Sequence, residues 1–177
     1  MTVQRRQEHG FVFEKMIADH LPIKKSDDIK FDCIYDNTPM QLKTTVDNTI
    51  RLGRYKNGLE ISKDFYLVYA RHKNGIITDA QAYLIDGLLY NRQFSFSIQH
   101  YFDEHIKPLP DRSGRYTEYC SDLKFMAKGK LVNPAVKKGG GGNNRLQSVI
   151  HIDDIPKLGS PVDLGLDKFF KIPFGIV

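Results

Sequence analysis

The residues with the clearest chemical potential are an acid, an amide and a lysine, Asp32, Gln41 and Lys43, on either side of a short polar turn. The carboxylate of Asp32, the side-chain carbonyl of Gln41 and the backbone carbonyl of Leu42 are oxygen donors of the kind that Mg²⁺ prefers. A lysine beside such a cation can help to lower the pKa of an attacking water or stabilise charge that develops at phosphorus. The pattern predicts a Mg²⁺ site, with Mn²⁺ as a substitute, suited to phosphate chemistry.

A second carboxylate is expected from a helix near the start of the chain. Glu14 adjoins the apolar positions Phe13 and Ile17, so packing of that helix beside the polar turn would bring Glu14 to the site. Glu8 competes for this role but lies nearer the fraying end of the helix. The predicted catalytic set is Glu14, Asp32, Gln41 and Lys43, and the predicted metal ligands are Asp32, Gln41, Glu14 and the Leu42 carbonyl.

Three elements must position these groups. Apolar residues at steps of three and four predict a helix over residues 5–21, which Pro22 ends. Two β-prone runs, residues 29–35 and 40–46, flank the turn at 36–39. If they form one hairpin, Asp32 and Lys43 can meet across it. Alone, that pair would be an exposed ion pair worth less than about 1 kcal/mol.

The rest of the sequence predicts an α/β fold: a mixed central sheet of four or five strands, with the first helix on one face and later helices on the other. Residues 47–62, which hold several basic residues, are expected to be a loop with one helical turn. Four glycines in a row predict a flexible loop over 137–145. Further predictions are strands at 65–71, 79–85 and 146–152, helices at 94–106 and 117–127, and an apolar tail at 164–177 that packs on the main body or on a second subunit.

The length and composition favour one globular domain. The chain has 177 residues, which suffices for a hydrophobic core, and we expect a catalytic core at about 5–90 followed by a helical and loop-rich part at 91–177. No apolar run approaches the ~20 residues that span a membrane, and the first residues lack the apolar core of a signal peptide. Two cysteines predict a reducing, cytoplasmic setting. The net charge of +5 is a mild indication of a polyanionic partner.

These residues resemble the PD-(D/E)xK nuclease superfamily. Its pattern is a helix that carries an acid, a strand with an Asp, and a second strand with an acid or Gln, one spacer and a Lys. Residues 10–14, which end in Glu14, are similar to the helix signature, Asp32 to the first-strand acid, and Gln41-Leu42-Lys43 to the Q-x-K variant. Asp32 follows Phe31 instead of proline, and Gln41 gives the site one negative charge fewer than the usual acid. The resemblance covers residues 7–45.

The resemblance implies a restriction-endonuclease-like core and Mg²⁺-dependent hydrolysis of phosphodiester bonds in double-stranded DNA. Within that class it implies a small sequence-specific type II restriction endonuclease that works as a homodimer, with a cognate methyltransferase acting on the same site. Junction resolvases, repair nucleases and homing nucleases are the alternatives. The basic and amide residues expected to contact DNA are Arg51, Arg54, Lys56, Lys137, Lys138, Asn143, Asn144 and Arg145.

Two further function classes stay open on the sequence. Gln41 in place of an acid is also what a DNA-binding module with a decayed nuclease site would carry, and a globular interaction protein with no nucleic-acid role is the third class. The best rival metal cluster is His151 with Asp153 and Asp154, which most often would be solvated loop residues. His100 and His105 lack the i,i+4 spacing of a helical zinc pair.

Overall fold

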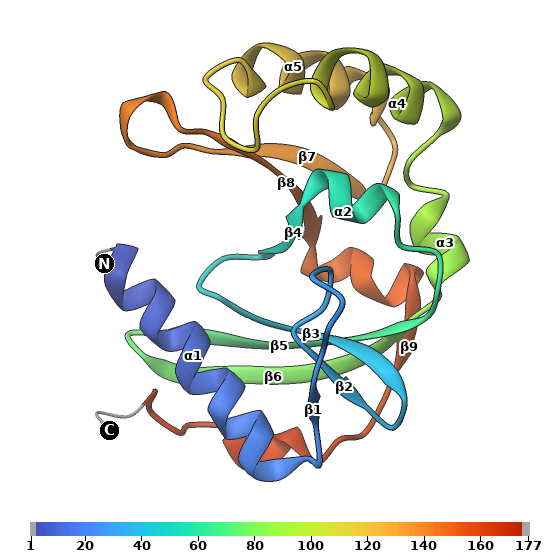
Figure 1. Ribbon diagram of the computed structural model, residues 1–177. Helices are drawn as coiled ribbons and strands as arrows, with labels where there is room; N and C mark the ends of the chain where they lie inside the picture. The colour runs from blue at the N-terminus through green and yellow to red at the C-terminus, as the bar shows by residue number, and fades with distance from the viewer. Residues whose placement is uncertain (1–2, 175–177) are drawn as a thin grey trace.

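A mixed sheet of six strands carries the predicted hairpin in the computed structural model, which describes residues 3–174 (Figure 1). The strand order is β1-β2-β3-β5-β6-β9. β3 and β5 are parallel, and the other neighbouring pairs are antiparallel. The strands are β1 (Lys24–Lys25), β2 (Cys33–Tyr35), β3 (Thr38–Thr45), β5 (Phe65–Lys73), β6 (Ile76–Ile85) and β9 (Gly159–Pro161). The mixed sheet is confirmed, with more strands than the four or five predicted.

The hairpin of β2 and β3 forms through a tight turn. Asp36 and Asn37 have φ values of 47° and 59°, as the primed two-residue turns require, and Tyr35 pairs with Thr38. β2 is shorter than the predicted strand, because residues 29 and 30 form a turn instead. The backbone N–H of Asp32 still donates to the carbonyl of Met40 at 3.0 Å. The pairing between the two strands therefore continues as far as Asp32.

A second sheet of three strands, in the order β4-β8-β7, corrects the prediction of a loop over residues 47–62. Ile50 and Leu52 alternate with polar residues and are buried, so this segment forms a strand followed by a short helix. Its partner β8 is almost a hundred residues away in the chain, which local patterns cannot reveal. The elements are β4 (Thr49–Arg54), α2 (Tyr55–Leu59), β7 (Val132–Lys137) and β8 (Arg145–His151).

The helices cover two different sheets. α1 (Val3–His20) packs on β3 of the large sheet, where Phe13 and Ile17 join Met40 and Leu42 in one buried cluster. The later helices are divided between the two sheets. The one that carries Tyr90 packs on the other face of the large sheet, as predicted, with the ring centroids of Tyr90 and Phe65 5.4 Å apart, whereas the last ones lie over β7 and β8 at the opposite end of the molecule (Figure 1). In chain order, the later helices are α3 (Gly87–Asn91), α4 (Phe96–Tyr101), a π-helical turn η1 (Phe102–Ile106) and α5 (Tyr116–Met126). Within residues 3–174, no helix is long and apolar enough to cross a membrane.

The C-terminal part of the chain completes both sheets. It was predicted to be helical and loop-rich, yet it supplies β7 and β8 to the small sheet and β9 to the large one. Leu166, Phe169 and Phe174 of the apolar tail are buried in the cluster beneath α1, so the tail packs on the main body as far as it is described. Three 3₁₀ turns complete the chain: η2 (Gly140–Gly142), η3 (Ile152–Lys157) and η4 (Leu166–Phe169).

Candidate active site

Asp32 and Lys43 are brought together as the hairpin requires. Oδ2 of Asp32 accepts hydrogen bonds from the Lys43 ammonium at 2.9 Å and from the backbone N–H of Leu42 at 2.7 Å. The side chains are 32% and 22% exposed, so the pair is partly shielded from water. The backbone donor fixes the carboxylate on the hairpin, which an ordinary surface ion pair lacks. The position of Asp32 is therefore defined by the hydrogen bonds to its Oδ2, and its carboxylate lies at the surface.

Glu14 of α1 belongs to the same group of charges. Its side chain is half-buried, and burial raises the pKa of its carboxyl above the ordinary value. The charge of Asp32 raises that pKa further, while the Lys43 ammonium lowers it. Two carboxylates that repel each other in a partly buried site favour binding of a proton or a cation. Glu8, the competing helix acid, is exposed to solvent.

Gln41 is held more firmly than an exposed amide would be. Its side chain is 3% exposed, and Nε2 donates to the backbone carbonyls of Lys30 at 2.9 Å and Leu52 at 3.3 Å. Gln41 thus ties β3 to the preceding turn and to β4. Its Oε1 is buried and accepts no hydrogen bond from any residue between 3 and 174, which leaves an acceptor for a ligand.

The backbone carbonyl of Leu42 lies on the correct edge of β3. In a strand, the N–H and C=O of one residue point to the same side. The N–H of Leu42 bonds to Asp32, so its carbonyl is directed to that edge, away from β5. Two carboxylates, an amide oxygen and a peptide oxygen are the donors that a hard divalent cation takes, so the residues present fit Mg²⁺ or Mn²⁺.

A cleft of about 480 Å³ begins beside the site, where β3 ends. Thr44 and Thr45, next to Lys43 in β3, form one wall, and Arg51 of β4 lines it as well. Lys137 and Lys138, at the end of β7, line it from the small sheet. Arg51 Nη1 donates to Gln147 Oε1 at 3.1 Å, so its charge has no acidic partner there. The cleft therefore places basic residues of both sheets, together with Asp47, near the end of β3, and its lining begins at Thr44, the residue after Lys43.

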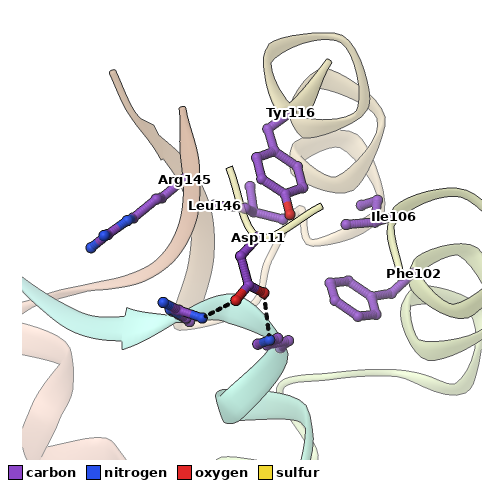
Figure 2. Close-up of a pocket in the computed structure, with 8 residues that line it drawn as sticks. Phe102, Ile106, Asp111, Tyr116, Arg145 and Leu146 are labelled. Atoms are coloured by element: carbon purple, nitrogen blue, oxygen red, sulfur yellow. Dashed lines mark hydrogen bonds and ion pairs between the residues drawn. The ribbon is translucent and has the colours of Figure 1, made fainter. Parts of the chain in front are cut away.

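Arg54 and Lys56, two residues expected to contact DNA, are already paired. The carboxylate of Asp111 accepts from Arg54 Nη1 at 2.8 Å and from Lys56 Nζ at 2.7 Å. In Figure 2, Asp111 extends toward the end of β4 and the start of α2, where dashed lines mark the two ion pairs. Lys56 first, and then Arg54, hold the pKa of Asp111 below its ordinary value. A phosphate would have to compete with this carboxylate.

The predicted residues of the 137–145 loop have two different roles. Lys137, Lys138, Asn143 and Arg145 line one pocket, together with Arg112. The sequence did not indicate Arg112, because only the tertiary structure brings its loop beside the loop between β7 and β8. Asn144 instead is 8% exposed, and its amide bonds inward to Gly139 and Thr117. The structure therefore places Asn144 in the support of the loop.

The rival cluster around His151 has a local structural role. His151 Nδ1 accepts from the backbone N–H of Asp153 at 3.2 Å and so caps η3, while Asp154 pairs with Lys157 at 2.6 Å. Within residues 3–174, no group of three or more His, Cys, Asp and Glu side chains is placed to hold a metal ion. The hairpin site has two carboxylates, so a metal there would also need the amide and peptide oxygens of β3.

Comparison with known proteins adds no family to these observations. No family model matches the chain, and no curated protein matches it at a significant level. The functional assignment of the chain therefore rests on the geometry of the site.

Proposed function

We propose that this protein is a Mg²⁺-dependent endonuclease that hydrolyses phosphodiester bonds in double-stranded DNA, built on a restriction-endonuclease-like core. The observation that carries the proposal is the Asp32–Lys43 pair, with the Leu42 N–H on the same carboxylate oxygen and Glu14 in electrostatic reach. The acid pair and the lysine gather at β3 where β2 stops, Gln41 on the same strand has an unused amide oxygen, and a cleft lined by Arg51, Lys137 and Lys138 as well as Asp47 lies at the end of β3.

Each residue has a distinct role in this proposal. Asp32, Glu14, Gln41 Oε1 and the Leu42 carbonyl would hold Mg²⁺, with Mn²⁺ as a substitute. The cation, when bound, would polarise the phosphate and make a coordinated water easier to deprotonate. Lys43 places a positive charge where negative charge grows on the phosphate oxygens. Burial and the charge of Asp32 raise the pKa of Glu14, which suits this carboxyl to take up a proton when no metal is bound.

Within this class we favour a sequence-specific type II restriction endonuclease, active as a homodimer and accompanied by a methyltransferase for the same DNA site. Resolvase, repair and homing nucleases are the alternatives, and preference for branched DNA over plain duplex would favour the first of them. A cytoplasmic protein is consistent with Cys33 and Cys120, which are free and buried in separate clusters.

The second candidate is a DNA-binding module without nuclease activity. The observation that favours it is the amide of Gln41, whose two hydrogen bonds to backbone carbonyls serve the fold whether or not a metal binds. Such a module would bind DNA in the same cleft and cleave none.

The test incubates the protein with plasmid DNA and Mg²⁺ or Mn²⁺, beside Asp32→Ala and Lys43→Ala variants. Both variants should lose at least about 100-fold in cleavage rate, as expected when a charge-stabilising group is removed. Lys15→Ala is the matched control, because Lys15 forms an exposed ion pair with Asp19 on α1 at 2.8 Å. It should cleave like the unaltered protein.

Each other outcome has a defined meaning. Binding of duplex DNA without cleavage in either metal would replace the nuclease by the binding module. Cleavage that persists in the Asp32→Ala and Lys43→Ala variants would place the active site elsewhere. A protein with no affinity for DNA would overturn both candidates and leave an interaction protein.

A further inference from the structure

The loop between β7 and β8 carries a basic pocket with no acidic residue in its lining. The pocket has a volume of about 400 Å³, and its charged residues are Arg112, Lys137, Lys138 and Arg145. Within residues 3–174, none of these four forms an ion pair within 4.0 Å. Like charges that gather without a counter-charge repel each other and disfavour the compact state. Such an arrangement is relieved when an anion binds.

The loop that shapes this pocket has a backbone path that requires glycine at several positions. A Cβ on Gly139 would lie 2.3 Å from the carbonyl oxygen of Asn143, so no other residue fits there. Gly141 and Gly142 have φ values of 65° and 78°, which also favour glycine. The backbone N–H of Asn144 donates to the Gly142 carbonyl at 2.8 Å.

The buried Asn144 fastens this loop to the chain segment that holds Arg112. Its Oδ1 accepts from the Gly139 N–H at 3.3 Å, and its Nδ2 donates to Thr117 Oγ1 at 3.1 Å. Its backbone carbonyl accepts from the Ser113 N–H at 3.0 Å. One side chain and its own peptide therefore connect the hairpin to residues 113–117 and keep Arg112 beside the lysines.

We propose that this pocket, made by the β7–β8 loop and Arg112, is a preformed binding site for the phosphate backbone of double-stranded DNA, with Asn144 as its positioning residue. The site is distinct from the catalytic group. Lys137 and Lys138 line both this pocket and the cleft at the end of β3, whose lining includes Thr44 next to Lys43, so a duplex held here would extend along that cleft.

The distribution of the four positive charges favours a DNA backbone as the ligand. Four cations on two chain segments suit several phosphates in a row better than one small anion, and backbone contacts carry no base sequence. Asn143, the one exposed amide in the lining, is placed to bond a phosphate or a base edge. Cleavage of the bound DNA rests on the proposed function. Binding of the DNA phosphate backbone in this pocket does not depend on it.

The test measures duplex DNA binding by fluorescence anisotropy in EDTA, where no cleavage occurs, over a range of salt concentrations. Arg112→Ala and Lys138→Ala should each weaken binding about threefold to tenfold, and each should reduce the slope of log K against log salt by about 0.9. Lys63→Ala is the matched control, because Lys63 is exposed and precedes β5, and it lines neither the pocket nor the cleft. It should change neither quantity. The melting temperature of the two pocket variants should not fall, since removal of a repelling charge does not weaken the fold.

Asn144→Ala should lower the salt slope as the cation variants do, although it removes no charge, because the cations are no longer held together. Asn133→Ala, at the exposed start of β7, is its control.

Arg112 and Lys138 variants that bind DNA like Lys63→Ala would overturn the pocket, even if plasmid cleavage upholds the nuclease. The expected loss of binding in these variants, with no cleavage by any form, would uphold the pocket and overturn the nuclease. Binding of inorganic phosphate without binding of duplex would also overturn the proposal.

Discussion

Two basic regions of this protein differ in whether their charges are already compensated. Arg54 and Lys56 share the carboxylate of Asp111. Arg112 and Lys138, in the pocket of the β7–β8 loop, have no acidic partner within the described chain. The sequence weights them equally, as basic residues near glycines. The difference teaches that the charge available to a partner is what remains after intramolecular pairing. Ligands are therefore expected at the pocket of the β7–β8 loop, whose cations have no counter-charge, and at Glu14 and Asp32, where two carboxylates share the single cation of Lys43.

The largest effect should come from adding an uncompensated charge to the candidate site. Gln41→Glu replaces an amide that donates to two backbone carbonyls by a carboxylate that repels them, next to the charges of Glu14 and Asp32. We expect a loss of about 1–3 kcal/mol in the free energy of unfolding without metal, measured by denaturant titration at pH 8. Gln147→Glu, beside Arg51, is the control and should stay within about 0.5 kcal/mol. An unchanged Gln41→Glu protein would show that the amide is not structurally required.

The next effect compares the two basic regions directly. The double variant Arg112→Ala/Lys138→Ala should bind duplex DNA more than about tenfold more weakly, because two phosphate contacts are lost. Arg54→Ala/Lys56→Ala should lose less than about threefold, because these cations must leave Asp111 before they can bind a phosphate. Anisotropy at one fixed low salt concentration gives both values. Equal losses of DNA affinity in the two double variants would show that pairing with Asp111 does not limit binding of DNA by Arg54 and Lys56.

A smaller effect should follow from removal of the compensating acid. Asp111→Asn frees Arg54 and Lys56, so duplex binding should tighten about threefold and the salt slope should become steeper by up to about 1.8, or 0.9 for each cation. Salt titration of the variant against the unaltered protein measures the slope. Asp163→Asn, an exposed acid with no ion pair in the described chain, is the control. Weaker binding by Asp111→Asn would show that Asp111 instead shapes the binding surface.

The smallest effect concerns Glu14 and Asp32, the two carboxylates that share the charge of Lys43. Folding raises the pKa of Glu14, so its ionised form disfavours the native state once the pH exceeds that raised pKa, and the penalty is absent below the ordinary pKa, where both states are protonated. Glu14→Gln should therefore raise the melting temperature in EDTA at pH 8 by up to about 3 °C, and by nothing at pH 3.5. Mg²⁺ should narrow the difference at pH 8 by stabilising only the unaltered protein. A lower melting temperature in EDTA would contradict this electrostatic picture.

Local patterns in the sequence account for much of the large sheet. Period-two alternation and turn residues such as Asp36-Asn37 and Asn74-Gly75 define hairpins whose partners are neighbours in the chain. The small sheet escaped prediction for the opposite reason. β4 was assigned to a loop because its arginines and glycine obscured the alternation of Ile50 and Leu52, and its partner lies far along the chain.

The sequence by itself determined the hairpin, the spacing of Asp32, Gln41 and Lys43, and the helix that carries Glu14, because each depends on residues close in the chain. Only the tertiary structure decided which charges are left for a ligand. Asp111 reaches Arg54 and Lys56 from more than fifty residues away, and Asn144 draws the segment with Arg112 to the hairpin. The reason is physical: a charge is compensated or free according to its neighbours in space, and those neighbours are fixed by long-range packing.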